Sequence, residues 1–289
     1  MRIIFLLLLI SFLSSCEKDI DIDLKNADAK LVVEATIETD QPPIVILSNS
    51  LDYYSSVSAE ILEGSFVHNA EVYITRNDTI HQLREYTIDS NGVKLSFYSL
   101  DISDPLLLGI PNTQYALKIV TGGKEYNATT TIPSVTKKID SLFSKPVYES
   151  PDSTKVQVLV TATDPPGLGD YIRYYTKTNS DVFFPPYNSV YEDAIIDGTT
   201  YTLPIQKGVN KNMDWVEDDL FFHKGDTVTV KTCNIDKATF DFCRTYEFAL
   251  QSTGNPFSNP TKVTGNISNG ALGYFGGYAP QFNTVIVPK

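Results

Sequence analysis

Residues 114–132 read QYALKIVTGGKEYNATTTI and predict a β-hairpin. Apolar and polar residues alternate from Gln114 to Val120, so alternate side chains point to one face of a strand. Gly122 and Gly123 supply the backbone freedom of a tight turn, and a second run returns to Ile132. This hairpin indicates a β-rich chain, because similar short runs precede and follow it.

About seven short strands of this kind, each followed by turn residues, lie between residues 29 and 135. Gln41-Pro42-Pro43 and Asn91-Gly92 are two of the turn signals. Strands at intervals of roughly 8–12 residues are typical of a β-sandwich. We therefore predict an immunoglobulin-like β-sandwich over residues 29–135.

Residues 136–289 predict a second β-rich domain, which contains one α-helix at about residues 237–252. There the apolar period changes from two to that of a helix, with Phe240, Cys243, Glu247 and Leu250 on one face. The fold class expected for the whole chain is therefore mainly β.

The composition excludes one class of partner. The 289 residues carry a net charge of −12, with no basic cluster, so we expect no nucleic-acid binding.

The N-terminus predicts export. Residues 1–15 hold one basic residue, a short apolar run and small residues, which is the pattern of a signal peptide. The run is too short to span a bilayer. The end of this segment, Leu13-Ser14-Ser15-Cys16, resembles the bacterial lipobox, which implies cleavage before Cys16 and its lipidation. A plain signal peptide followed by a chance cysteine is the alternative.

Residues 16–28 continue as an acidic tether behind the lipid-bearing cysteine. Acidic residues with a lysine at this place also resemble the surface-export signal of Bacteroidota lipoproteins. That resemblance implies an outer-membrane lipoprotein, anchored by lipid and facing the cell surface. An ordinary charged tether is the alternative.

Two further cysteines remain, Cys233 and Cys243. An oxidising compartment would allow them to form a disulfide that joins a strand end to the helix. The alternative is a pair of free buried thiols.

Two aromatic segments are candidates for a ligand or partner surface. The first is the long polar stretch 179–219, and the second is a glycine-rich strand near the C-terminus. Aromatic faces with polar rims can hold sugars, peptides or a partner protein. The alternative is packing, under the long loop or onto the helix. The candidate residues are Phe183, Phe184, Tyr187, Tyr191, Trp215, Tyr274, Phe275 and Tyr278.

The sequence contains no recognised catalytic motif. The three histidines have no metal-ligand spacing with one another or with cysteine. We expect no catalytic residues, no metal, no cofactor and no enzyme activity. The acidic cluster Asp214, Glu217, Asp218 and Asp219 lacks the alternating spacing of a calcium loop, which favours a solvated loop.

Residues 254–260, GNPFSNP, and 265–278, GNISNGALGYFGGY, resemble the end of a Bacteroidota outer-membrane lipoprotein family. The start of the mature chain, CEKDID at 16–21, also matches this family, which is known as a domain of unknown function (DUF4249-like). Members are often encoded beside TonB-dependent transporters. The resemblance implies a non-enzymatic accessory or substrate-capturing partner of such an outer-membrane barrel. A free-standing surface module or adhesin that binds glycan or protein is the alternative.

Overall fold

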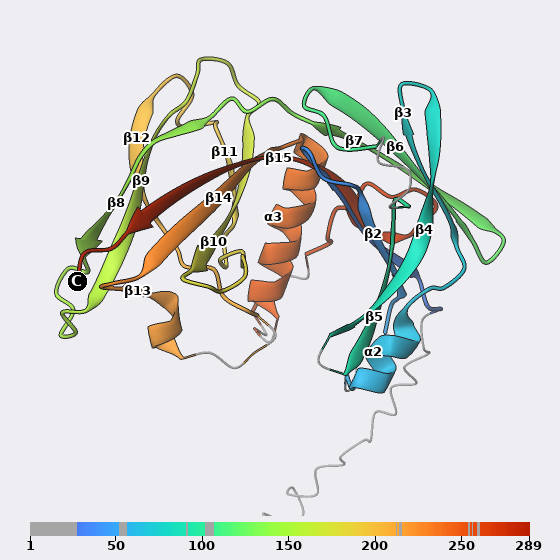
Figure 1. The fold of residues 1–289 in the computed structure, drawn as a ribbon, viewed down its shortest axis with the longest axis horizontal. Helices are drawn as coiled ribbons and strands as arrows, with labels where there is room; N and C mark the ends of the chain where they lie inside the picture. Colours follow the sequence, from blue (N-terminus) through green and yellow to red (C-terminus); the bar gives the residue numbers. More distant parts are fainter. Residues whose placement is uncertain are drawn as a thin grey trace, which may run out of the picture.

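The structure is a computed structural model, and Figure 1 shows its fold. It describes residues 28–51, 57–90, 92–101, 107–211, 213, 216–253, 255, 257–258 and 261–289. The predicted signal peptide, Cys16 and residues 17–27 of the tether lie outside the described residues. The described chain is mainly β, as predicted.

The N-terminal half has a sandwich-like arrangement of strands around one core. One layer contains β15 (Leu272–Ile286), β1 (Leu31–Glu38), β2 (Ile44–Asn49) and β5 (Val93–Ser99). The other contains β3 (Glu71–Arg76), β6 (Thr113–Thr121) and β7 (Lys124–Ile132). The long strand β4 (Thr79–Ser90) belongs to both layers, because its first part pairs with β3 and its second part with β5.

The predicted hairpin at residues 114–132 is confirmed as β6 and β7. Its alternation produces the expected burial, since Tyr115, Leu117 and Ile119 all lie in the core. Gly122 and Gly123 both have positive φ, which suits the type I′ turn of a two-residue hairpin loop.

The C-terminal half contains a second pair of facing sheets. The smaller sheet holds β8 (Lys138–Pro146), β9 (Lys155–Thr163), β12 (Thr200–Ile205) and β13 (Phe222–His223). It faces β11 (Val190–Glu192), β10 (Tyr171–Thr178) and β14 (Thr227–Ile235). Val158, Tyr174, Phe222 and Val230 are among the side chains buried between these sheets.

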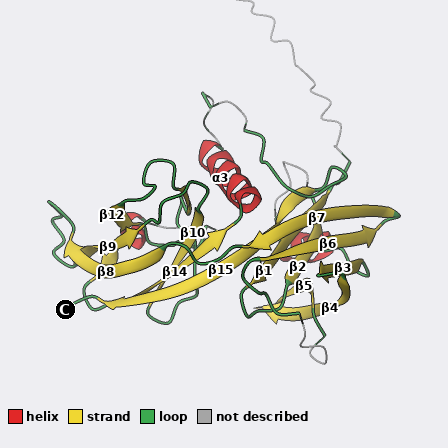
Figure 2. Cartoon of the chain, turned by 90° about the horizontal axis from the view of Figure 1, so that it is seen from above, coloured by secondary structure: helices red, strands yellow, loops and turns green. Residues whose placement is uncertain are grey.

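Strand β15 joins the two halves in one eleven-stranded sheet. Its first part pairs in parallel with β1, and its second part pairs antiparallel with β14. Figures 1 and 2 show this strand running from the junction of the two halves to the C-terminal end of the molecule. Gly277 allows β15 to lie close to the backbone of β7, because a Cβ at this position would be only 2.6 Å from the carbonyl oxygen of Thr131.

The predicted helix is confirmed as α3 (Lys237–Ser252), which lies against one face of the shared sheet (Figure 2). Phe240, Cys243 and Glu247 are buried, whereas Leu250 remains exposed. Two shorter helical segments are α2 (Ala59–Ser65) and the 3-10 turn η1 (Glu217–Leu220). Among the described residues, no helix has both the length and the apolar character needed to cross a bilayer.

Asp236 caps α3 and also ties it to β7. Its Oδ1 accepts from the backbone N–H of Thr239 at 2.9 Å, and its Oδ2 accepts from the Thr130 hydroxyl and the Thr131 N–H. We expect Asp236→Ala to lower the free energy of unfolding by about 2 kcal/mol, since the cap and two further acceptor contacts disappear. Urea unfolding measures this loss. Ser58→Ala, which removes only the exposed cap of α2, is the matched control, and equal losses would contradict the tie to β7.

Candidate functional site

A cavity of about 340 Å³ lies between the two sheets of the C-terminal half. This volume is near the lower end of the roughly 300–1,000 Å³ that small-molecule sites occupy. Apolar side chains from both sheets form most of its wall. They include Ile139, Val160, Ala162, Ile172, Leu203, Ile205 and Val230.

The cavity exists because the two sheets end in short edge strands that do not close over each other. In the described sheets, β11 pairs with β10 and β12 pairs with β9, and neither has a second neighbour. Leu203, which lines the cavity from β12, is therefore still 43% exposed. Ile195, on the loop between β11 and β12, is 95% exposed. The lip of the cavity is thus apolar and accessible to water.

Neutral hydrogen-bonding groups accompany the apolar wall. Burial raises the pKa of Tyr174, Tyr191 and Tyr201, so their hydroxyls stay protonated at neutral pH. The Tyr174 oxygen accepts from the backbone N–H of Gln206 at 3.1 Å. The hydroxyl of Thr232 is buried and has no hydrogen-bond partner among the described residues. The wall can therefore hold an apolar molecule and donate to one or two polar atoms.

Lys137 supplies the buried positive charge at the edge of the cavity. Its Nζ pairs with Oδ1 of Asp164 at 2.9 Å, and both side chains are almost completely buried. Its backbone carbonyl accepts from Nε2 of Gln281. Because the ammonium group is paired, it does not present a free charge to a ligand.

Three carboxylates meet beside the cavity, those of Asp164, Asp193 and Asp197. Asp164 follows β9, and the other two lie on the loop between β11 and β12. Oδ2 of Asp193 accepts from the backbone N–H groups of Gly169 and Asp170, at 2.9 and 3.0 Å. Oδ1 of Asp197 accepts from the N–H of Gly167 at 2.6 Å. These bonds fasten the loop 164–170 to the loop 193–199.

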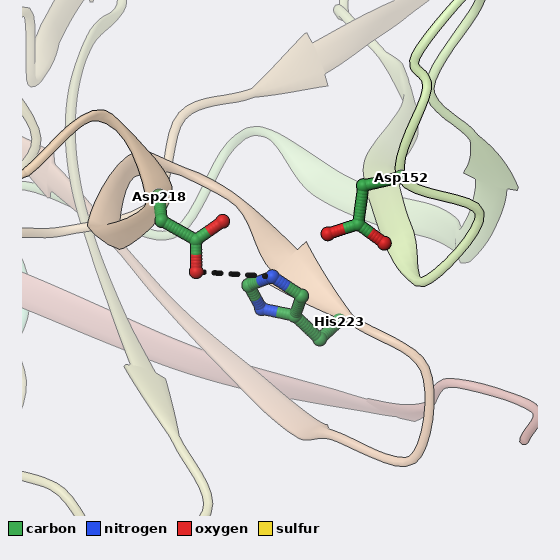
Figure 3. Close-up of side chains that lie close together, drawn as sticks. All are labelled: Asp152, Asp218 and His223. Carbon is green, nitrogen blue, oxygen red and sulfur yellow. Dashed lines mark ion pairs between the residues drawn. The ribbon is translucent and has the colours of Figure 1, made fainter.

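A second group of possible metal ligands lies on the surface of the smaller sheet. Figure 3 shows Asp152, Asp218 and His223, which come from the β8–β9 loop, η1 and β13. Asp218 pairs with Lys155 at 2.9 Å and approaches His223 Nε2 at 3.5 Å, and the hydrogen bond from Lys155 is the main cause that lowers its pKa. Hydrogen bonds from Thr154 lower the pKa of Asp152. Lys155 and His223 thus contact both oxygens of Asp218, and Thr154 donates twice to Oδ1 of Asp152.

The acidic residues at 214–219 that the structure describes do not form one group of ligands. Asp214 lies outside the described residues, as does the side chain of Glu217. Asp218 joins the surface group, and Oδ2 of Asp219 accepts from the N–H of Val216 at 3.0 Å. These contacts fit a solvated loop with local hydrogen bonds.

Of the predicted aromatic residues, the structure places Tyr191 in the wall of the cavity. Phe183 instead packs on Phe282 of β15, with ring centroids 5.8 Å apart. The backbone of Phe184 pairs with β10, and Tyr187 is half-buried, with Nζ of Lys211 5.5 Å from the centre of its ring. Trp215 lies outside the described residues. Of the aromatic candidates in the long stretch, Tyr191 is thus the one that lines the cavity among the described residues.

The expectation of a partner surface at Tyr274, Phe275 and Tyr278 is wrong, because all three side chains are buried. Successive residues of a strand point to opposite faces. Tyr274 and Tyr278 therefore pack under α3, and Phe275 enters the core of the N-terminal half. The glycines between them allow this packing.

The predicted disulfide is not formed in the structure. Cys233 and Cys243 are both free and buried. Burial raises the pKa of the two thiols to about 12 and about 11, so both stay protonated at neutral pH. Cys233 belongs to the apolar cluster beneath α3, and Cys243 is a buried residue of α3 itself. Arg173 is a charged neighbour of each thiol.

We expect neither of these thiols to react with iodoacetamide in the native protein. Both should react once urea unfolds the chain without reductant, because no bond joins them. Mass spectrometry of peptides containing Cys233 and Cys243 measures the label. A peptide pair that is linked until reductant is added would show that the disulfide forms after all.

Sequence reasoning missed Asp164, Asp193 and Asp197 as a group. The sequence does show Asp164 before Pro165-Pro166-Gly167, and Asp197 before Gly198, which are turn signals. The pairing of β9 with β12 and of β10 with β11 brings these turns together. That pairing is not visible in the local pattern.

One family comparison identifies the chain. No curated protein matches the sequence. The family model described as "Domain of unknown function (DUF4249)" matches residues 17–282, which is nearly the whole chain. The resemblance found in the sequence is confirmed at this level, and the chain belongs to the DUF4249 family.

Proposed function

We propose that this chain is a non-enzymatic binding lipoprotein that holds an apolar ligand in the cavity between its C-terminal sheets. It works at the outer membrane, on the cell surface, as an accessory or substrate-capturing partner of a TonB-dependent transporter. The observation that carries the proposal is the cavity of about 340 Å³, with its apolar wall and exposed apolar lip.

The chemistry of the wall favours an uncharged, mainly apolar ligand. The nearest buried cation, Lys137, is paired with Asp164. The tyrosine hydroxyls are neutral, and Thr232 offers one hydroxyl without a partner among the described residues. A small number of polar groups in an apolar cleft is the usual arrangement of a small-molecule site. A sugar, with hydroxyl groups over most of its surface, would leave many of them unpaired on this wall.

The proposed anchor rests on the N-terminal sequence. A signal peptide that ends in Leu13-Ser14-Ser15-Cys16 supports lipidation of Cys16, and an acidic tether follows. More than one acyl chain holds a protein stably to a membrane, whereas one holds it only marginally. The anchor would keep the cavity close to a membrane partner.

The lip of the cavity supports a handover role. Leu168 and Ile195 lie on the two loops fastened by Asp193 and Asp197, and both apolar side chains are strongly exposed. Exposed apolar groups that gather at one place mark sites of contact with partners. A transporter that received the ligand would contact this lip.

Cross-linking and affinity purification of the full lipoprotein from its native membrane test the proposal. We expect a TonB-dependent transporter to be recovered, and Leu168→Asp with Ile195→Asp to reduce its recovery. Tyr148→Asp, at an exposed site on the β8–β9 loop, is the matched control. Recovery of no transporter, together with retained ligand binding, would favour a free-standing binding module instead.

A further inference from the structure

We propose that Asp164, Asp193 and Asp197 form a calcium site that fixes the lip of the cavity. One oxygen from each carboxylate lies within 4.8 Å of the others. The three residues come from two loops, which their hydrogen bonds already hold together. The site stands on these contacts and does not depend on the proposed function.

Each carboxylate keeps one oxygen that no described donor occupies. Backbone N–H groups engage Oδ2 of Asp193 and Oδ1 of Asp197. Lys137 pairs with Oδ1 of Asp164, outside hydrogen-bond geometry, and Oδ2 of Asp164 contacts no donor among the described residues. Asp164 is only 1% exposed, so this oxygen is shielded from bulk solvent.

The charge balance also favours a cation. The three carboxylates of the cluster face one paired ammonium group, that of Lys137. Buried charges in proteins are paired or coordinate metals. A divalent ion would neutralise this excess.

The ligand set favours calcium. It contains oxygen atoms alone, which are the ligands of hard cations, and no nitrogen or sulfur that would select zinc. Calcium accepts six to eight oxygens in flexible geometry, including backbone carbonyls, whereas magnesium requires a near-ideal octahedron and keeps several waters. Carboxylates spread over two loops suit calcium better than magnesium.

Bound calcium would control the mouth of the cavity. Ala194, Ile195 and Ile196 line the cavity. In the sequence they lie between Asp193 and Asp197, on the loop 193–199. Fixing those two carboxylates would fix the three side chains that meet the ligand. This consequence, unlike the site itself, rests on the proposed function.

Calorimetric titration of the full chain with calcium chloride, after removal of bound metal by EDTA, tests the site. We expect one ion per chain and a higher melting temperature when calcium is present. Asp197→Asn should weaken calcium binding at least tenfold, because one charged ligand is lost. The amide oxygen can still accept from Gly167, so the loop contact survives. Without calcium, this variant should melt no lower than the wild type, since one of the crowded charges is gone.

Asp152→Asn, in the exposed group of Figure 3, is the matched control and should leave calcium binding unchanged. Asp193→Asn provides a second variant with the same expected loss. The site is overturned if calcium up to about 10 mM gives neither heat nor a melting shift, a range that covers weak extracellular sites. It is also overturned if Asp197→Asn responds like the wild type, or if magnesium has an equal effect. The titration uses no apolar ligand, so its failure would leave the proposed function untouched.

Discussion

Ala162→Trp is expected to weaken the binding of an apolar probe at least tenfold, which is a loss of about 1.4 kcal/mol or more. Ala162 lies on β9, is buried and lines the cavity. An indole ring at this position enters the cavity and occupies the space that a ligand would take. Because that space is not already packed, the substitution should cost much less stability than overpacking a dense core.

The probe is phenylnaphthylamine, an uncharged fluorophore whose emission rises in apolar surroundings, titrated into residues 17–289 without detergent. Leu159→Trp is the matched control. Leu159 lies on the same strand but on its opposite face, away from the cavity. We expect this variant to bind like the wild type. Equal affinity of Ala162→Trp and the wild type would show that the probe does not enter the cavity.

Phe275→Ala is expected to lower the free energy of unfolding by about 3–5 kcal/mol, the largest stability effect that we expect from one substitution. Its side chain is 0% exposed and lies in the core of the N-terminal half. Removing the ring loses its transfer free energy and leaves a cavity that the surrounding strands cannot easily fill.

Phe282→Ala is the control on the same strand. Phe282 is 55% exposed, so its loss should cost less than about 1 kcal/mol. Urea unfolding of the two variants gives the comparison directly. Similar losses would contradict the placement of Phe275 in the core, and with it the position of β15 between the two halves.

The hairpin 114–132 and the helix 237–252 could be predicted from the sequence, because each depends on a local pattern. Alternation from Gln114 to Val120 determines which side chains are buried, and two glycines determine the turn. The helix likewise follows from the spacing of Phe240, Cys243 and Glu247.

The parallel pairing of β15 with β1 could not be predicted in this way. The two strands are separated by more than 200 residues, and parallel neighbours require a long connection that leaves no short sequence signal. The same reason explains the mistaken surface at Tyr274 and Tyr278. Aromatic residues among glycines suit either an exposed face or close packing, and only the position of α3 decides between them.

Part of the candidate site could likewise be predicted from the sequence, and part could not. Tyr191 could be selected from the sequence, because an aromatic residue in a long polar loop already suggests binding. The wall contributed by β9 and β12 could not be selected, since Ala162 and Leu203 have the pattern of ordinary core residues. The acidic group missed in the sequence depends on two loops that meet through strand pairing.

A crystal structure of residues 17–289 soaked with a brominated alkyl alcohol tests the binding cavity most directly. We expect one anomalous bromine peak between β9 and β12 on one side and β10 and β14 on the other, beside Ala162 and Val230. The alcohol group should lie near a tyrosine hydroxyl or Thr232. Bromine found only on the outer surface, or not at all, with native side chains filling the cavity, would contradict a ligand site in this protein.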